Sequence, residues 1–411
     1  MAKADIARLV VAGVFLALCA SIAVPTATTF CDAFGEKARG AKRKPAVEER
    51  IKKARGAMES EFPQKLSFVN LNGLFIRLIG QHLCNGVLKT EPHDILLQTT
   101  ARPLRAEKFA AKMRQFADYC ARHKARFLYV QLPRKLDIRN RMIPAGVEDQ
   151  AYVNVRKMLK SFREARIDCL DMCTEFAATP DDVARNFYRT DHHWRNDAAF
   201  RMAGLLAAEI ARRCSVPEAD ALRAAKLLSP ESWTREEYPS CFLGSLGRRT
   251  GSLFSGLDDL TVLRPRFKTR MSIRVPSKRV DLTGTFEETN MHRASEALSS
   301  ASSFVTDAYS ALYVGGIYPQ TIHKNPGAPL GVRVLLIGDS FARPVEAFLS
   351  VAVRRLDVID LRRTKRDFRL SKYVRQMKPD IVVQMINPGS INIDKQRGPK
   401  VGAPAMFLYG L

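Results

Sequence analysis

The sequence lacks the signatures of nucleic-acid-binding and zinc proteins. Its 411 residues contain no zinc-finger spacing, no RNP-type aromatic motif and no helix-turn-helix signature. Cys169 and Cys173 have three residues between them, but no second cysteine or histidine pair completes a zinc site. There is also no internal repeat and no low-complexity tract. An apolar content of 46% is ordinary for a globular core, so wholesale disorder is not expected.

Acidic residues are few compared with basic ones. The chain has 42 Asp and Glu against 66 Lys and Arg, a formal net charge of +24. Such a field attracts polyanions, whether nucleic acid, anionic lipid or acidic polysaccharide. Because the basic residues are spread along the chain and no nucleic-acid motif is present, we expect a generally basic surface and no nucleic-acid partner.

Residues 1–30 are predicted to be a signal peptide or an N-terminal membrane anchor. Lys3 and Arg8 precede an apolar run over residues 9–24, and small residues follow Pro25. The basic cluster in residues 37–44 opposes export by the positive-inside tendency. An apolar packing helix is the structural alternative. We favour an exported, periplasmic or extracytoplasmic protein, mainly because of the chemistry described below.

Eight cysteines leave the redox state open. One of them, Cys19, lies in the N-terminal apolar run, so seven remain, which is an odd number. An exported domain can hold one or two disulfides, while buried free thiols explain the same count. The sequence does not decide between them.

The rest of the chain predicts an α/β domain. Helical spacing in residues 105–123 precedes an apolar strand at 125–132, and the same alternation recurs up to a last strand at 380–386. This order predicts a parallel sheet with helices on both faces. The predicted divisions are a basic spacer (31–64), the domain (65–395) with a β-rich, loop-rich insertion (about 235–330), and a C-terminal tail (396–411).

Ser340 is the predicted nucleophile. Gly338-Asp339-Ser340-Phe341 directly follows the apolar strand segment 332–338, and a helix is predicted from residue 344. A serine on such a strand-to-helix turn has helix N–H groups behind it, which favour a developing oxyanion. Gly338 lets the backbone turn sharply. The alternative is that a Gly-Asp-Ser string recurs by chance.

Asp191-His192-His193-Trp194 offers the base that a serine nucleophile requires. Asp191 can orient His193 through Nδ1, which leaves Nε2 to accept the serine proton. His192 is the alternative base, Trp194 is expected to wall the site, and Asp191 could equally be a structural cap. Adjacent histidines beside an aspartate also suit a metal ion. Because the other five histidines are scattered, we expect no metal and no cofactor.

Asn387 and Gly338 are the candidate oxyanion groups. Asn387 ends the last predicted strand, where its side chain could donate to an oxyanion. The alternative for Asn387 is a turn residue that precedes Pro388.

The two motifs, in this order, resemble the DHHW family and the wider group of SGNH-hydrolase-like proteins related to the alginate O-acetyltransferases AlgX and AlgJ. The resemblance spans about residues 65–392. It extends to further segments at residues 127–135, 186–194, 242–251, 256–259 and 378–383.

The resemblance implies a flavodoxin-like SGNH core with its motifs in permuted order. It implies an exported O-acetyltransferase or acetylesterase for a cell-surface or extracellular polysaccharide, with Ser340 as nucleophile, His193 as base and Asp191 as its orienting acid. It also implies a membrane-bound O-acyltransferase partner that supplies acetyl groups. Because little chain follows residue 392, we expect polysaccharide to bind the core domain. The alternative is a non-catalytic envelope protein that binds polysaccharide or such a partner.

Overall fold

The structure of this protein is a computed structural model. It describes residues 20–21, 23–29, 31–32, 51, 65–91, 93–99, 103–136, 142–143, 146–147, 149–365 and 367–387. The chain divides into two compact units, Met1–Phe75 and Ile76–Leu411. Most of the predicted export signal and spacer, and all of the predicted C-terminal tail, lie outside the described residues. Within the described part, we find no helix with both the length and the apolar character that a membrane span requires.

The second unit is built around one eight-stranded sheet. Five neighbouring strands are parallel, and three more extend one edge in antiparallel fashion. In order across the sheet, the strands are β5 (Cys169–Asp171), β4 (Arg126–Gln131), β13 (Ile381–Ile386), β11 (Arg333–Gly338), β12 (Arg355–Ile359), β10 (Gln320–Lys324), β8 (Met271–Val275) and β9 (Val280–Gly284). This mixed α/β sheet, mostly parallel, confirms the predicted fold class.

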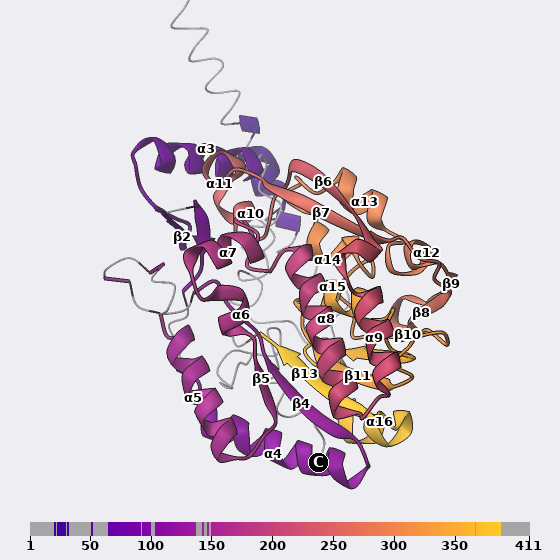
Figure 1. Ribbon diagram of the computed structural model, residues 1–411. Coiled ribbons are helices and arrows are strands. Elements are labelled where there is room, and N and C mark those ends of the chain that lie inside the picture. The colour runs from indigo at the N-terminus through magenta and orange to yellow at the C-terminus, as the bar shows by residue number, and fades with distance from the viewer. Residues whose placement is uncertain are drawn as a thin grey trace, which may run out of the picture. The chain divides into compact units, whose positions relative to one another are not determined.

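Strand β11 shows how the sheet is covered on both faces. Val334 and Leu336 join a core cluster that contains residues of helices α8 (Asn196–Arg213) and α15 (Ala342–Leu349). Leu335 and Ile337 point the other way, into a cluster with three other helices, because side chains alternate along a strand. Those helices are α4 (Ala106–Arg122), α5 (Ala151–Glu164) and α16 (Leu370–Met377). Figure 1 shows α8 running beside α9 (Glu218–Leu227).

The predicted insertion at about 235–330 is only partly separate from the sheet. Its β8, β9 and β10 form the antiparallel edge of the main sheet, and the long hairpin of β6 (Trp233–Phe242) and β7 (Asp258–Pro265) stands apart as its own two-stranded sheet. A small antiparallel sheet is formed by β1 (Leu83–Cys84), β2 (Val87–Thr90) and β3 (Ile95–Leu97). Other α-helices from residue 65 onward, within the described residues, are α3 (Lys65–Leu78), α6 (Cys173–Ala177), α7 (Pro180–Asn186), α10 (Gly247–Thr250), α11 (Ser252–Ser255), α12 (Phe286–Asn290), α13 (Ala294–Ser299) and α14 (Ala308–Leu312).

The cysteines of the described residues are all free thiols. Burial raises the pKa of Cys120 and that of Cys169 to about 12. Such thiols behave as small apolar side chains rather than as nucleophiles. The seven free cysteines are Cys31, Cys84, Cys120, Cys169, Cys173, Cys214 and Cys241.

Candidate active site

Ser340 stands on the turn between β11 and α15, at the carboxyl end of a central strand. Gly338 makes this turn possible, because a Cβ at that position would lie 2.6 Å from the Cβ of Ala342. The buried carboxylate of Asp339 accepts hydrogen bonds from the backbone N–H of Phe341 (3.0 Å) and of Asn387 (2.9 Å). The turn is thereby fixed to the end of β13. The Ser340 N–H donates to no residue that the structure describes.

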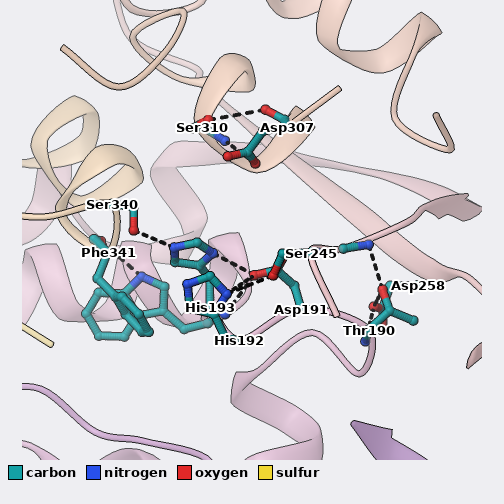
Figure 2. Close-up of polar contacts among 12 residues, drawn as sticks. Thr190, Asp191, His192, His193, Ser245, Asp258, Asp307, Ser310, Ser340 and Phe341 are labelled. Carbon is teal, nitrogen blue, oxygen red and sulfur yellow. Dashed lines mark hydrogen bonds and ion pairs between the residues drawn. The ribbon is translucent and has the colours of Figure 1, made fainter. Parts of the chain in front are cut away.

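A continuous line of hydrogen bonds joins Ser340 to the distant Asp-His segment. His193 Nε2 lies 2.7 Å from Ser340 Oγ, and His193 Nδ1 lies 2.6 Å from Asp191 Oδ1 (Figure 2). Asp191 and His193 are both buried. The fold thus brings together the three side chains that the sequence analysis singled out, in the order that nucleophilic catalysis requires.

Asp191 is held ionised by its surroundings. Burial pushes its pKa upward, but His193, His192 and the hydrogen bonds from His193 and Ser245 outweigh burial and hold the pKa well below its usual value. The backbone N–H of His193 donates to Oδ1 (2.9 Å), and that of Ser245 donates to Oδ2 (2.5 Å). A carboxylate with several donors keeps its charge even where water is excluded.

Further hydrogen bonds, made by Thr190, hold the segment that contains Asp191 and His193 in place. Asp258, at the start of β7, accepts from the Thr190 N–H (2.7 Å) and hydroxyl (2.6 Å), and the Gly244 N–H donates to the Thr190 hydroxyl at 2.8 Å (Figure 2). Gly244 approaches so closely that a Cβ there would lie 2.4 Å from the Cβ of Asp191. Both segments match the resemblance noted above, but residue chemistry alone assigned no role to either.

Aromatic rings enclose His193. Tyr309 stacks on the imidazole with ring centroids 4.1 Å apart, and Phe341 lies on the ring at 4.8 Å. Trp194, expected to wall the site, is instead fully buried behind it, and its Nε1–H donates to the Phe341 carbonyl at 3.2 Å. Trp194 therefore holds the turn that contains Ser340 through this hydrogen bond and does not line the pocket. Tyr309 had no sequence signal that pointed to this role.

A pocket of about 290 Å³ opens onto Ser340. Among the residues that the structure describes, the charged lining is entirely basic and includes no carboxylate. Burial lowers the pKa of Lys135 to about 8, and its Nζ donates to the carbonyls of Leu96 and Arg189 at 3.1 Å each. The lining consists of Leu96, Leu97, Gln98, Thr99, Arg134, Lys135, Leu136, His192, Leu246, Ser340, Phe341, Arg362 and Asn387.

The structure separates the two oxyanion candidates. Asn387 lines the pocket together with Ser340. Gly338 is part of the β11–β13 ladder opposite Met385 and does not line the pocket. The backbone N–H of Ser340, on the same turn, has no hydrogen-bond partner among the described residues and is a further candidate donor.

His192, the alternative base, occupies a different place from His193. Its Nδ1 lies 2.8 Å from the Ser245 hydroxyl and 3.4 Å from Asp191 Oδ1. Asp191, His192 and His193 could also gather around a metal ion, since their ligand atoms lie within 4.8 Å of one another. That use would compete with the 2.6 Å contact between Asp191 and His193.

Comparisons with known proteins show which proteins this domain resembles. Residues 93–238 match the family model described as "SGNH hydrolase-like domain, acetyltransferase AlgX". The matched segment contains Asp191 and His193 and ends before Ser340. No curated protein matches the chain.

Two solved structures share the fold over most of the chain. Bacillus cereus PatB1 with a sulfonyl adduct has a TM-score of 0.60 at 16% identity, over 79% of this chain and 97% of that one. A DHHW family protein from Eubacterium siraeum has a TM-score of 0.53 at 13% identity, over 75% of this chain and 92% of that one. The resemblance expected from the two motifs is therefore confirmed.

Proposed function

We propose that this chain is an SGNH-type serine enzyme that transfers acetyl groups to, or removes them from, a polysaccharide. The observation that carries this proposal is the unbroken line from Ser340 through His193 to Asp191, with links of 2.7 and 2.6 Å. The AlgX-type family match supports acetyl chemistry as the reaction class.

The geometry supports a reaction in two halves. In the first, His193 Nε2 takes the proton of Ser340 as Oγ attacks the acetyl carbonyl carbon. The Ser340 N–H is placed to donate to the oxyanion, and His193 then protonates the leaving alcohol, which leaves acetyl-Ser340. In the second, His193 takes the proton of an incoming hydroxyl as its oxygen attacks the acetyl carbon. Release of Ser340 restores the enzyme. Water as acceptor makes an esterase, and a sugar hydroxyl makes a transferase.

Location and partners belong to the same proposal. Residues 1–30 have the composition of an export signal or anchor, so the enzyme would act outside the cytoplasm on a surface or extracellular polysaccharide. A transferase there needs an acetyl donor delivered across the membrane. A membrane-bound O-acyltransferase is the partner that this requirement suggests.

Turnover of p-nitrophenyl acetate tests the proposal. We expect the full chain to release p-nitrophenol in a burst followed by a slower phase, because acylation precedes deacylation. Ser340→Ala should lose both phases while it keeps its unfolding temperature. Ser310→Ala, which removes a hydroxyl that donates to the Asp307 carbonyl at 3.3 Å, is a control that should retain turnover. Retained turnover in Ser340→Ala would refute the assignment.

A further inference from the structure

The two adjacent histidines of the 191–194 segment lie in opposite environments. His193 is buried with both ring nitrogens engaged, whereas 49% of the His192 side chain is exposed in the pocket that contains Ser340. Their ring centroids are 3.8 Å apart, so the His192 ring packs against the ring of His193. The proposed proton transfers use His193 alone, which leaves His192 without a role.

Among the described residues, only one ring nitrogen of His192 has a hydrogen-bond partner. Its Nδ1 contacts the Ser245 hydroxyl at 2.8 Å, while its Nε2 makes no hydrogen bond to any residue within the described ranges. Ser245 is itself fixed, because its backbone N–H donates to Asp191 at 2.5 Å. The exposed imidazole is therefore held relative to the same carboxylate that orients His193.

His192 is neutral at working pH. Burial of the ring lowers its pKa to about 3, the neighbouring His193, Lys135 and Arg134 act in the same direction, and Asp191 opposes them. Because half of the side chain is exposed, solvent weakens this effect, yet an imidazole at its ordinary pKa is also mostly neutral above pH 7. A neutral imidazole offers one donor and one acceptor, which matches a hydroxyl group.

We propose that His192 is an acceptor-binding residue that holds a second hydroxyl group of the incoming alcohol. The proposal rests on the acetyl-transfer function above and deepens it. A vicinal diol would bind with one hydroxyl on His192 Nε2 and the adjacent hydroxyl at acetyl-Ser340. His192 thereby favours deacylation by a polyol, such as a sugar, over deacylation by water.

His192 exchanges no proton in this step. The acceptor oxygen forms a bond to the acetyl carbon, the bond from that carbon to Ser340 Oγ breaks, and the acceptor proton passes through His193 to Ser340. The contribution of His192 is orientation. One hydrogen bond to a neutral group contributes about 1 kcal/mol, which corresponds to about a fivefold preference.

The test measures how acetyl-Ser340 partitions between alcohols and water. The full chain is acylated with p-nitrophenyl acetate in the presence of either glycerol, a vicinal polyol, or ethanol, which has one hydroxyl. The ratio of acetylated alcohol to free acetate is then measured. We expect the wild-type protein to favour glycerol over ethanol, and His192→Phe, which keeps an aromatic ring but removes both nitrogens, to lose about fivefold in the glycerol ratio. Any change in the burst rate of this variant should be smaller.

Two further variants test whether the effect comes from the hydrogen bond of His192. His192→Asn restores a neutral hydrogen-bonding group and should recover part of the glycerol preference, whereas His123→Phe, at the end of α4, should behave as wild type. An unchanged glycerol ratio in His192→Phe, an equal loss of burst and transfer, or a wild-type protein without glycerol preference would overturn the inference. Absence of any burst in the wild-type protein would instead refute the proposed function itself.

Discussion

Two histidine–carboxylate pairs, His193 with Asp191 and His323 with Glu346, differ in how completely they are hydrogen-bonded. In the first, His193 Nδ1 lies 2.6 Å from Asp191, and each ring nitrogen has a partner. In the second, the nearest approach of His323 to Glu346 is 3.9 Å, and neither ring nitrogen of His323 has a hydrogen-bond partner in the described part of the chain. Both arrangements are almost completely buried.

The second arrangement contains a buried ion pair. Arg343 Nη1 donates to Glu346 at 2.8 Å, and Thr321 donates to the other carboxylate oxygen at 2.8 Å, but Nε and Nη2 of Arg343 have no partner among the described residues. Burial raises the pKa of Glu346 to about 7 against the opposing pull of Arg343. Burial and Arg343 together lower the pKa of His323 to about 3.

A buried carboxylate keeps its charge only where hydrogen-bond donors surround it. Asp191 keeps its charge because donors surround it, and the cost of burial is offset. The cluster of Arg343, Glu346 and His323 is only partly satisfied, so it costs stability instead of preparing a reaction. A histidine beside a carboxylate therefore becomes a candidate base only where the hydrogen bonds are complete and a nucleophile is in reach.

Removing the charge of the first carboxylate should have the largest effect. Asp191→Asn keeps the shape of the side chain but no longer fixes the required tautomer of His193, so we expect kcat for p-nitrophenyl acetate to fall by about 10³–10⁴-fold. The matched change in the second arrangement, Glu346→Gln, should alter kcat less than about threefold. Comparable losses of kcat in the two variants would remove the distinction between the arrangements.

A methyl group at Gly244 should have the next largest effect. The added Cβ would lie 2.4 to 2.6 Å from the backbone and Cβ of Asp191, so Asp191 must move. We expect Gly244→Ala to lower kcat about 100-fold and the free energy of unfolding by about 1–3 kcal/mol. Gly204→Ala, within helix α8, meets its nearest atom at 3.8 Å and should retain activity and gain slightly in stability. Normal turnover in Gly244→Ala would show that the close approach is unimportant.

The smallest expected effect concerns stability against pH. The folded protein keeps His323 neutral, with a pKa of about 3 against an ordinary value of 6.5, so the unfolded chain binds a proton that the native state does not. Stability from this group is present above pH 6.5 and is lost as the pH falls toward 3. Glu346 acts oppositely: its raised pKa favours the native state below about pH 4.5, and that contribution is lost as the pH rises through 7.

Replacing His323 therefore exposes the Glu346 contribution. Between pH 6.5 and 4.5, His323→Leu should lose less stability than the wild type on acidification, by about 1–2 kcal/mol in chemical unfolding experiments. His123→Phe serves as a control without this effect. Parallel pH profiles for His323→Leu and the wild type would mean that the buried imidazole does not resist protonation.

The sequence predicted the parts of the fold that local patterns encode. The apolar runs at β4, β11 and β13 and the periodic segment at α4 were predicted with small errors at their ends, because burial and periodicity act over few residues. The strands β8, β9 and β10 were assigned to an insertion within the domain, because the pairing of β10 with the distant β12 leaves no local pattern in the sequence. Strand pairing across a sheet depends on long-range contacts.

The candidate site likewise contains residues that the sequence identified and residues that it did not. Ser340, His193 and Asp191 stand in short strings whose chemistry is readable from the residues. Asp258, Gly244 and Tyr309 act through contacts with residues far along the chain, and an isolated aspartate, glycine or tyrosine predicts no such contact. Trp194 was expected in the pocket wall, but a large apolar ring beside a buried turn packs behind the site instead.

The most direct measurement is the identity of the residue that becomes covalently modified. A fluorophosphonate reacts with an activated serine, and peptide mass spectrometry of the treated full chain locates the adduct. We expect a single adduct on Ser340 that is lost in His193→Ala, with labelling retained in His323→Leu. A chain that stays unlabelled, or an adduct on a different serine, would contradict the claim that His193 and Asp191 activate Ser340.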